Sequence, residues 1–396
     1  MSNSVPEGWY QSKLGVVADL IMGQSPPSNT YNNSRIGLPF FQGKTDFGSH
    51  YPSVRVWCSK PTKVAEKDSI LFSVRAPVGD INIASESCCI GRGLAAIKGT
   101  KVEQAFLYQT FKFVKHRFQL LAQGSTFEAV SGGEMRDFKL ILPPLPEQKK
   151  IAAILTSVDT VIEKTQAQID KLKDLKTGIM QELLTKGIGH TEFKDSPVGR
   201  IPVEWEVKDL GDLAFKIEGG GTPPRKNPDY WGKGYPWATV KDLKSIRLSS
   251  TEESITKTGL INSSSKLVPA GTVILATRMA VGKAVVFDCD VTINQDLKAF
   301  YPKEKLNNKF LLQWYLYKSK YIASLGTGST VKGIRVDDLK LLIIAVPPYD
   351  EQIIIANKIE GIEVLLNHKI AKIQKMTSLK KALMQDLLTG KVRVKV

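Results

Sequence analysis

Two long stretches of the chain repeat each other. Residues 143–188 read PPLPEQKKIAAILTSVDTVIEKTQAQIDKLKDLKTGIMQELLTKGI, and residues 347–392 read PPYDEQIIIANKIEGIEVLLNHKIAKIQKMTSLKKALMQDLLTGKV. They align without a gap at an offset of 204 residues, with identical residues at both ends. A duplicated stretch of this length indicates that the chain is built as a tandem repeat.

Each stretch has the apolar spacing of one long helix. The prolines at its start cannot continue a preceding helix, and Gly187 and Gly390 suit caps at its end. A helix of about 37 residues is roughly 55 Å long. The apolar positions step by four and three, as in a coiled-coil seam: Ile151, Leu155, Val158, Ile162 and Ile169 in the first copy, and Ile355, Ile359, Ile362, Leu366 and Ile373 in the second.

Polar residues interrupt both seams. Thr165 and Lys176 break the first, and Lys369 and Lys380 break the second. A helix with one apolar stripe needs a partner, and the other copy is the obvious candidate. The alternative is that each stripe packs on its own globular domain.

The flanking segments repeat more weakly. Trp9 resembles Trp205, and Arg75-Ala76-Pro77-Val78-Gly79 resembles Arg278-Met279-Ala280-Val281-Gly282, whereas the middles diverge. The sequence therefore predicts a variable domain at 1–142, a helix at 143–188, a second variable domain at 189–346 and a second helix at 347–396. Short β-type runs at 69–74 and 272–276 and helical runs near 103–122 and 307–325 indicate mixed α/β domains and an α+β fold class.

The charge indicates a polyanionic partner. The chain of 396 residues carries a formal net charge of +16 and has a pI near 9.5. Residues 1–142 hold 16 basic and 11 acidic side chains, and residues 189–346 hold 23 and 17. Nucleic acid is the commonest polyanion, and its surface is expected on these two segments. A merely basic soluble protein is the plainer alternative.

The remaining composition excludes several classes. No signal peptide and no apolar run long enough for a membrane span are visible, which predicts a cytoplasmic protein without a membrane partner. The four cysteines form no CxxC pair and the four histidines are scattered, so we expect reduced thiols and no metal site.

Catalysis by this chain is not expected. No glycine-rich cofactor fingerprint and no phosphate-binding loop occur, so no cofactor and no catalytic residue are predicted. The run Val346-Pro347-Pro348-Tyr349 imitates the tetrad of amino-methyltransferases, but Val346 cannot accept a hydrogen bond from an amine. We interpret that run as the entry to the second helix.

At this point the chain resembles a known family, the specificity subunits of type I restriction-modification systems. The resemblance rests on the two variable domains, the PPLPEQ and PPYDEQ entries, and the Gln-x-Leu-Leu-Thr ends of the helices. It implies two target-recognition domains that each read one half of a split double-stranded DNA target. It also implies an antiparallel coiled coil that sets the gap between half-sites and recruits two methyltransferase subunits, with a restriction translocase as a further partner.

Repeated small, hydroxylated or basic residues in the variable domains are the candidate DNA contacts. Basic side chains grip phosphates, and hydroxyl groups in glycine loops let the backbone approach them. The candidates are Lys44, Arg75, Arg92, Ser125 and Thr126 in the first domain, and Lys241, Arg278, Ser329, Thr330 and Lys332 in the second. Gln42 and Asn294-Gln295 are weaker candidates for reading base edges.

Two other functions stay open from the sequence. One is a bipartite DNA-binding regulator that works without a methyltransferase. The other is a scaffold built on the coiled coil without any nucleic acid. Co-purification with a methyltransferase and salt-dependent DNA binding distinguish these alternatives from the specificity subunit.

Overall fold

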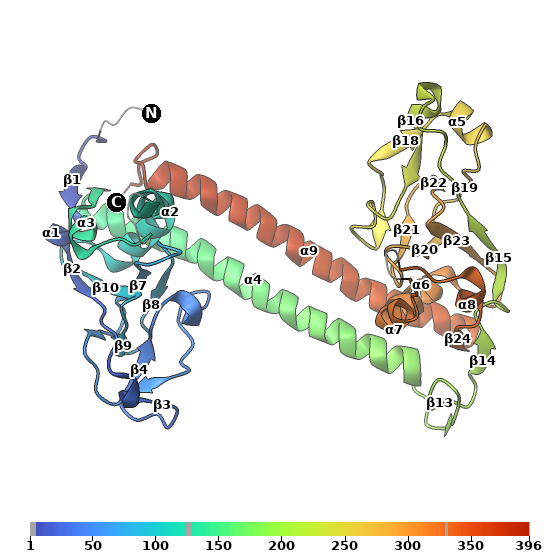
Figure 1. Ribbon diagram of the computed structural model, residues 1–396, viewed down its shortest axis with the longest axis horizontal. Coiled ribbons are helices and arrows are strands. Elements are labelled where there is room, and N and C mark those ends of the chain that lie inside the picture. The colour runs from blue at the N-terminus through green and yellow to red at the C-terminus, as the bar shows by residue number, and fades with distance from the viewer. Residues whose placement is uncertain (1–4, 124–127, 329–331, 396) are drawn as a thin grey trace. The chain divides into compact units, whose positions relative to one another are not determined.

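The computed structural model describes residues 5–123, 128–328 and 332–395, and these divide into two compact units. Unit 1 contains residues 1–167 and 370–396, and unit 2 contains residues 168–369. Each unit therefore combines one domain, the first half of the long helix that follows it, and the second half of the other long helix (Figure 1).

The first domain contains two main sheets and two short helices beside α2. One sheet has the order β2-β10-β7-β8 and is antiparallel, and the other has the order β3-β5-β4-β9-β6, with β4 and β9 parallel. The elements are β1 (Tyr10–Lys13), α1 (Leu14–Val17), β2 (Ala18–Met22), β3 (Tyr31–Asn32), β4 (Leu38–Phe41), β5 (Trp57–Cys58), β6 (Val64–Ala65), β7 (Ile70–Ser73), β8 (Ile81–Ile83), β9 (Cys88–Ile90), β10 (Leu94–Gly99), α2 (Gln104–Gln123), α3 (Gly132–Asp137) and β11 (Lys139–Leu142).

The second domain repeats this plan. Its sheets have the orders β15-β23-β20-β21-β17 and β18-β16-β22-β19, and β16 and β22 are parallel. The elements are β12 (Phe193–Lys194), β13 (Ile201–Pro202), β14 (Glu206–Asp209), β15 (Ala214–Gly219), β16 (Trp231–Ala238), β17 (Arg247–Leu248), β18 (Glu253–Ile255), α5 (Lys257–Ile261), β19 (Leu267–Val268), β20 (Val273–Ala276), β21 (Ala284–Phe287), β22 (Val291–Ile293), β23 (Leu297–Pro302), α6 (Asn308–Tyr317), α7 (Ser319–Ser324), α8 (Val336–Lys340) and β24 (Ile343–Val346).

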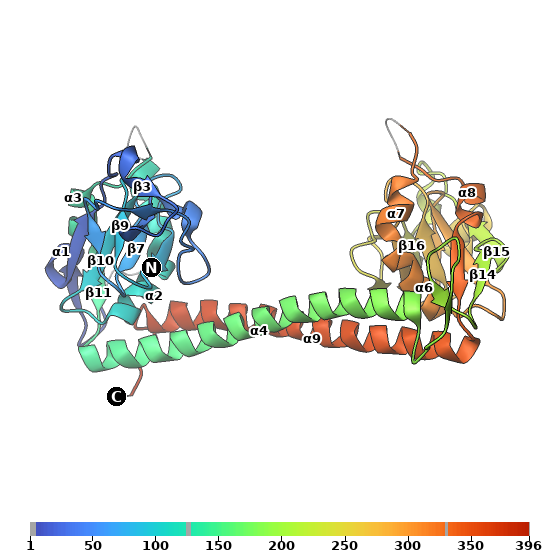
Figure 2. The same cartoon turned by 90° about the horizontal axis from the view of Figure 1, so that it is seen from below.

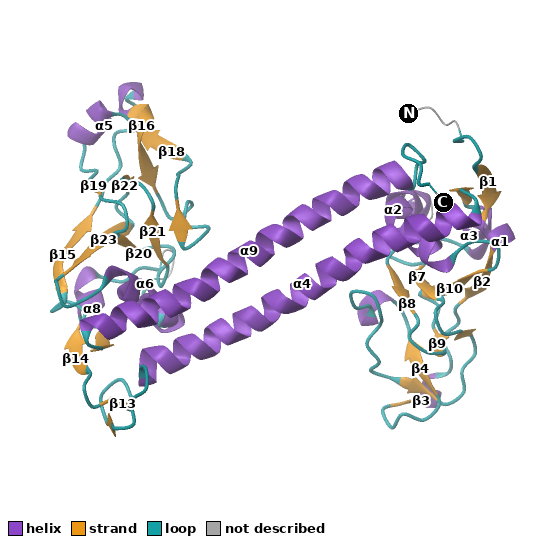
Figure 3. Ribbon diagram, turned by 180° about the vertical axis from the view of Figure 1, so that it is seen from behind, coloured by secondary structure: helices purple, strands orange, loops and turns teal. Residues whose placement is uncertain are grey.

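Buried apolar side chains join helix to sheet in each domain. Phe106, Phe111 and Phe118 on one face of α2 are fully buried in a cluster with Ile70 and Phe72 of β7. In the second domain Phe310 and Leu311 of α6 pack in the same way with β20. Figure 3 shows that all the labelled strands lie in the two domains and that the two longest helices lie outside the sheets. The α+β class expected from the sequence is confirmed.

The two longest helices lie within the stretches 143–188 and 347–396, and the second ends before residue 396. α4 spans Leu145–Lys186 and α9 spans Tyr349–Leu387, each directly after its proline pair. Gly187 and Gly390 have φ angles of +69° and +71°, a backbone conformation that strongly favours glycine at a helix end.

α4 and α9 pack against each other in antiparallel directions. In unit 1, Glu147 and Asp159 of α4 bond to Arg393 and Lys380 respectively, so residue numbers rise along one helix as they fall along the other. In unit 2, Lys176 bonds to Glu363, and the backbone nitrogen of Ile188 bonds to Glu351. Figures 1 and 2 show the two ribbons side by side from two directions. The expected antiparallel pairing of the two helices is confirmed.

Candidate nucleic-acid interface

Three loops of the first domain meet at one place. The amide of Val74 donates to the carbonyl of Gly93 at 3.0 Å, and the amide of Val130 donates to the carbonyl of Val74 at 2.9 Å. These bonds bring exposed Arg75, after β7, next to the loop of exposed Arg92, after β9. The candidates Ser125 and Thr126 lie outside the described residues.

The second domain forms the same junction. The amide of Thr277 donates to the carbonyl of Asp296, and the amide of Met279 donates to the carbonyl of Lys332, both at 2.9 Å. Arg278 and Lys332 are exposed there, and the Arg278 guanidinium lies 3.5 Å from the Asp296 carboxylate. Ser329 and Thr330 lie outside the described residues. Arg75, which follows β7, and Arg278, which follows β20, thus lie at the same junction of their respective domains.

The lysine candidates Lys44 and Lys241 have different surroundings. Lys44 lies next to the Arg92 loop, because the amide of Gly93 donates to the carbonyl of Gln42, but its ammonium group bonds to Asp80 at 2.8 Å. Burial acts to raise the pKa of Asp80, yet the hydrogen bonds from Lys115 and Lys44 outweigh it and hold that pKa below its ordinary value. Lys44 therefore braces a loop, whereas Lys241 is exposed in the turn after β16.

A second set of residues joins each domain to its helix. The Glu147 carboxylate is 3% exposed and accepts hydrogen bonds from the indole of Trp9 at 3.2 Å and from Arg393 at 2.8 Å. The hydrogen bond from Arg393 is the main reason that the pKa of Glu147 lies below its ordinary value. In unit 2 the Glu351 carboxylate accepts from the indole of Trp205 at 3.0 Å.

The glutamine next in sequence completes this joint. The Gln148 side chain is fully buried, accepts from the amide of Glu103 at 2.8 Å and donates to the carbonyl of Pro143 at 2.8 Å. Gln352 makes the equivalent bonds to Asn307 at 2.8 Å and Pro347 at 2.9 Å. The repeated Glu-Gln pair thus anchors the start of each long helix to its own domain.

Ion pairs between the helices explain two of the three lysines that interrupt the seams, Lys176 and Lys380. Lys380 bonds to Asp159 at 2.5 Å, and Lys176 bonds to Glu363 at 2.7 Å. Burial acts to raise the pKa of Asp159, but hydrogen bonds from Lys380 and Gln109 leave it below its ordinary value. Gln313 is the counterpart of Gln109 and donates to Glu363 at 3.4 Å. The three pairs of equivalent positions, Lys176 and Lys380, Asp159 and Glu363, and Gln109 and Gln313, share the offset of 204 residues.

The predicted seam residues lie on the shielded side of both helices. Six of them are buried: Ile151, Leu155, Ile169, Ile355, Ile359 and Ile362. Val158, Ile162, Leu366 and Ile373 are partly buried. Ile151 and Leu155 belong to the core of the first domain as well as to the helix pair, because Leu387 joins the same cluster. Near the helix starts, the apolar stripe therefore packs both on the other long helix and on its own domain.

The sequence pattern does not mark these joint residues as functional groups. Glu147 and Gln148 belong to a repeated motif, Gln109 belongs to none of the quoted motifs, and Arg393 has no repeated counterpart. The available signal was the common offset, which relates the acidic residues Asp159 and Glu363 to each other and the basic residues Lys176 and Lys380 to each other.

The described residues hold no group of three or more His, Cys, Asp and Glu side chains that could bind a metal ion. Within the same ranges, no helix is both long and apolar enough to cross a membrane. Cys58, Cys88 and Cys89 are free and buried, and burial raises the pKa of Cys88 to about 12, so its thiol stays protonated.

Comparison with known proteins identifies the family. The model of the type I restriction modification DNA specificity domain matches residues 6–174 and 202–375. The chain belongs to this family. Each matched region contains one domain and most of the helix that follows it, so this specificity subunit contains two target-recognition domains. Within a type I restriction-modification enzyme, this family is the specificity subunit and not a catalytic one.

Two curated relatives come from Methanocaldococcus jannaschii. The putative type I restriction enzyme MjaX specificity subunit is 43% identical over 185 residues, which is 46% of this chain and 44% of that protein. The type I restriction enzyme MjaVIII specificity subunit is 26% identical over 412 residues, covering 99% of this chain and 94% of that one. The chain thus matches less than half of the first relative's length and nearly all of the second.

A solved structure has a similar fold. The crystal structure of the type I restriction-modification system S subunit from M. genitalium superposes with a TM-score of 0.66 at 13% identity. The match covers 98% of this specificity subunit and 97% of that chain. At this identity the likeness supports the fold alone.

Proposed function

We propose that this chain is the DNA-reading subunit of a type I restriction-modification enzyme, with each target-recognition domain binding one half of a bipartite double-stranded DNA sequence. The observation that carries the proposal is the repeated loop junction, where Arg75 and Arg278 are exposed on equivalent loops. Exposed Arg92 lies on a second loop of the junction in the first domain, and exposed Lys332 lies on the third loop in the second domain. Basic groups on such loops contact phosphates and set the register on the duplex.

The two long helices serve as spacer and docking element in this proposal. α4 has 42 residues, which corresponds to a length of about 63 Å. Large apolar side chains remain exposed on the helices, among them Val161, Leu175, Val364 and Leu365. Such side chains on an otherwise polar helix suit a protein partner. Two methyltransferase subunits are the partners proposed, and a restriction translocase would join the same complex.

The experiment is reconstitution with a methyltransferase subunit of the same system. The complex is expected to methylate adenines within one bipartite sequence, and sequencing of modified bases on random DNA reads out that sequence. Binding to duplex DNA is expected to fall steeply with salt. Specific DNA binding by the chain alone, with no co-purifying methyltransferase, would favour a stand-alone regulator; absence of any DNA binding would favour a scaffold.

Exchange of one domain gives an independent check. Replacing residues 189–346 with the same region of another specificity subunit is expected to change one half-site and leave the other unchanged, because each unit has its own core. Sequencing of methylated sites measures both half-sites at once. A chimaera that alters both half-sites, or neither, contradicts separate reading by the two domains.

A further inference from the structure

The parallel strand pairs of the two domains end in equivalent loops. In the first domain Phe41 of β4 pairs with Ile90 of β9, and in the second domain Ala238 of β16 pairs with Ile293 of β22. The next residues are Gly91-Arg92-Gly93 and Asn294-Gln295-Asp296, and both loops lead directly into the following strand, β10 or β23. Arg92 and Gln295 therefore occupy the same structural position.

Both loops are held rigidly while their central side chain stays exposed. In the first domain a Cβ atom on Gly91 would lie 2.4 Å from the Gln42 side chain, and one on Gly93 would lie 2.5 Å from the Gln42 carbonyl oxygen. Neither neighbour of Arg92 could therefore carry a side chain without a local shift. In the second domain Asn294 donates to Asp296 at 2.9 Å, and both are buried around exposed Gln295.

Each loop is contacted by one hydroxyl group from an equivalent position of its own domain. The Ser25 hydroxyl accepts from the amide of Arg92 at 3.3 Å and from the side-chain amide of Gln42 at 2.8 Å. The Thr222 hydroxyl donates to the side-chain oxygen of Gln295 at 2.7 Å. Ser25 and Thr222 are themselves equivalent, because the residue before each donates its amide to the last residue of the β9 or β22 strand.

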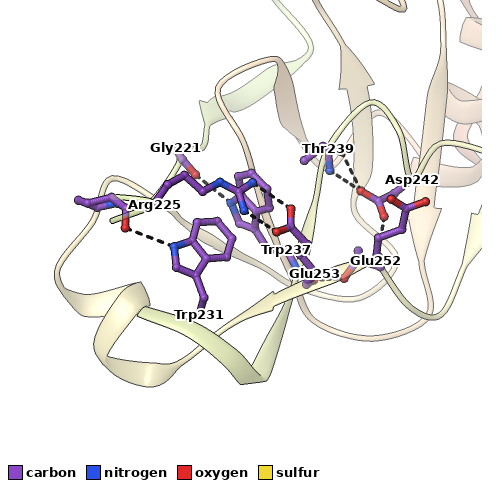
Figure 4. Close-up of polar contacts among 10 residues, drawn as sticks. Gly221, Arg225, Trp231, Trp237, Thr239, Asp242, Glu252 and Glu253 are labelled. Carbon is purple, nitrogen blue, oxygen red and sulfur yellow. Dashed lines mark hydrogen bonds and ion pairs between the residues drawn. The ribbon is translucent and has the colours of Figure 1, made fainter. Parts of the chain in front are cut away.

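Aromatic side chains fix the segment that carries each hydroxyl. Tyr31 donates to the carbonyl of Pro26 at 2.8 Å in the first domain. In the second domain the Trp237 indole donates to the carbonyl of Gly221 at 3.0 Å, and the Arg225 guanidinium lies 3.8 Å from the ring centre of Trp231 (Figure 4). Arg225 is also paired with Glu253. Thr222 therefore lies on a segment held from both sides, which preorganises the Gln295 side chain.

The two equivalent residues, Arg92 and Gln295, have side chains of different charge. Arg92 carries a positive charge and Gln295 is neutral, so the two equivalent positions offer different hydrogen-bonding groups. Arginine pairs with the O6 and N7 atoms of guanine, and glutamine pairs with the N6 and N7 atoms of adenine. Arg92 lines a hollow of about 570 Å³ together with Gln42, and among the described residues no ion pair engages its guanidinium. Both side chains are therefore placed to meet a base edge.

We propose that Arg92 and Gln295 are equivalent specificity-determining residues, with Arg92 reading a guanine in one half-site and Gln295 reading an adenine in the other. This assignment rests on the proposed function and deepens it. Ser25 and Thr222 act as positioning residues, because they contact the readers' loops and not the bases.

The test uses the complete complex with its methyltransferase and a DNA library randomised at both half-sites. Arg92→Gln is expected to replace a guanine requirement by an adenine preference at one base pair, and Gln295→Arg the reverse at one base pair of the other half-site. The preference at that base pair should change by about 10- to 100-fold. Lys101→Gln, which removes one exposed charge from the loop before α2, is the control and should leave both half-sites unchanged.

The outcomes separate this inference from the proposed function. A wild-type complex that methylates no bipartite sequence contradicts the proposed function itself. A wild-type complex with a defined target, whose two variants keep that same target at uniformly lower rates, overturns the inference. For a variant too slow to methylate, binding is compared on duplexes that differ at one base pair: loss of discrimination at that pair supports the inference, and equal weakening on all duplexes overturns it.

Discussion

Glu147 shows how one buried carboxylate connects three separate parts of a unit. Its partners Trp9 and Arg393 lie 138 and 246 residues away in the sequence. The Pro-Pro-x-x-Glu-Gln motif marked the position as repeated and as the start of a helix. Its partners could not be predicted, because nothing local to residues 143–148 specifies which distant indole or guanidinium reaches the carboxylate.

Replacing this carboxylate should destabilise unit 1 in a pH-dependent way. Glu147→Gln is expected to lower the free energy of unfolding by about 1–2 kcal/mol at neutral pH, because a buried charge-assisted bond is lost. Since the folded-state pKa of Glu147 lies below its ordinary value, its stabilisation is present above about pH 4.3 and is lost as the pH falls through the folded-state pKa. The difference between wild type and variant should therefore shrink in acid.

Urea unfolding at several pH values measures this difference. Glu182→Gln is the matched control, because Glu182 makes an exposed pair with Lys186 and its loss should change stability by less than about 0.5 kcal/mol. A gap between wild type and Glu147→Gln that stays constant down to pH 3 would contradict the assigned role of the charge.

At the scale of elements, the apolar spacing was enough to predict α4 and α9 and their pairing. It could not explain Lys176 and Lys380, which look like defects in a one-dimensional pattern. Their acidic partners lie on the facing helix at 2.7 and 2.5 Å, and a pairing across two helices has no signature in the spacing of either one. A polar pair within an apolar seam fixes the register of the two helices.

Replacing only one residue of such an ion pair should lower the free energy of unfolding more than replacing both residues with apolar ones. Lys176→Ala is expected to lower the free energy of unfolding by about 1–3 kcal/mol, because the mostly buried Glu363 carboxylate loses its partner. The double variant Lys176→Leu with Glu363→Leu should recover most of that loss, since two apolar side chains suit the seam. Lys186→Ala, at an exposed pair, is the control. Thermal unfolding measures all four proteins, and a double variant weaker than Lys176→Ala would refute the pairing argument.

At the scale of the whole molecule, the repeat predicted the order of domains and helices. The contents of the domains were harder to predict. Their strands are two to eight residues long and pair with partners far away in the sequence, so the register depends on contacts that no local pattern records. The loop junctions around Arg75 and Arg278 arise only from that pairing.

The spacer role gives a prediction at this scale. Seven residues that continue the heptad pattern, inserted after Ala167 in α4 and after Lys369 in α9, should lengthen the helix pair by about 10 Å. At about 3.4 Å per base pair, the gap between half-sites should grow by about 3 base pairs. Mapping of methylated sites reads out the gap, and an unchanged gap with intact half-sites would reject the spacer role.

The division into units also dictates an order of folding. Unit 2 is one continuous segment, residues 168–369, whereas unit 1 needs residues 370–396 to complete its core, where Leu387 and Leu388 pack with Trp9 and Ile151. The ribosome therefore makes the first domain early, but the residues that complete its core are made last. At a synthesis rate of about 5–20 residues per second, the apolar surface around Trp9 stays exposed for roughly 10–40 s before Leu387 and Leu388 are made. We expect the second domain to close during that interval, which would leave the nascent chain with one complete domain and one incomplete core.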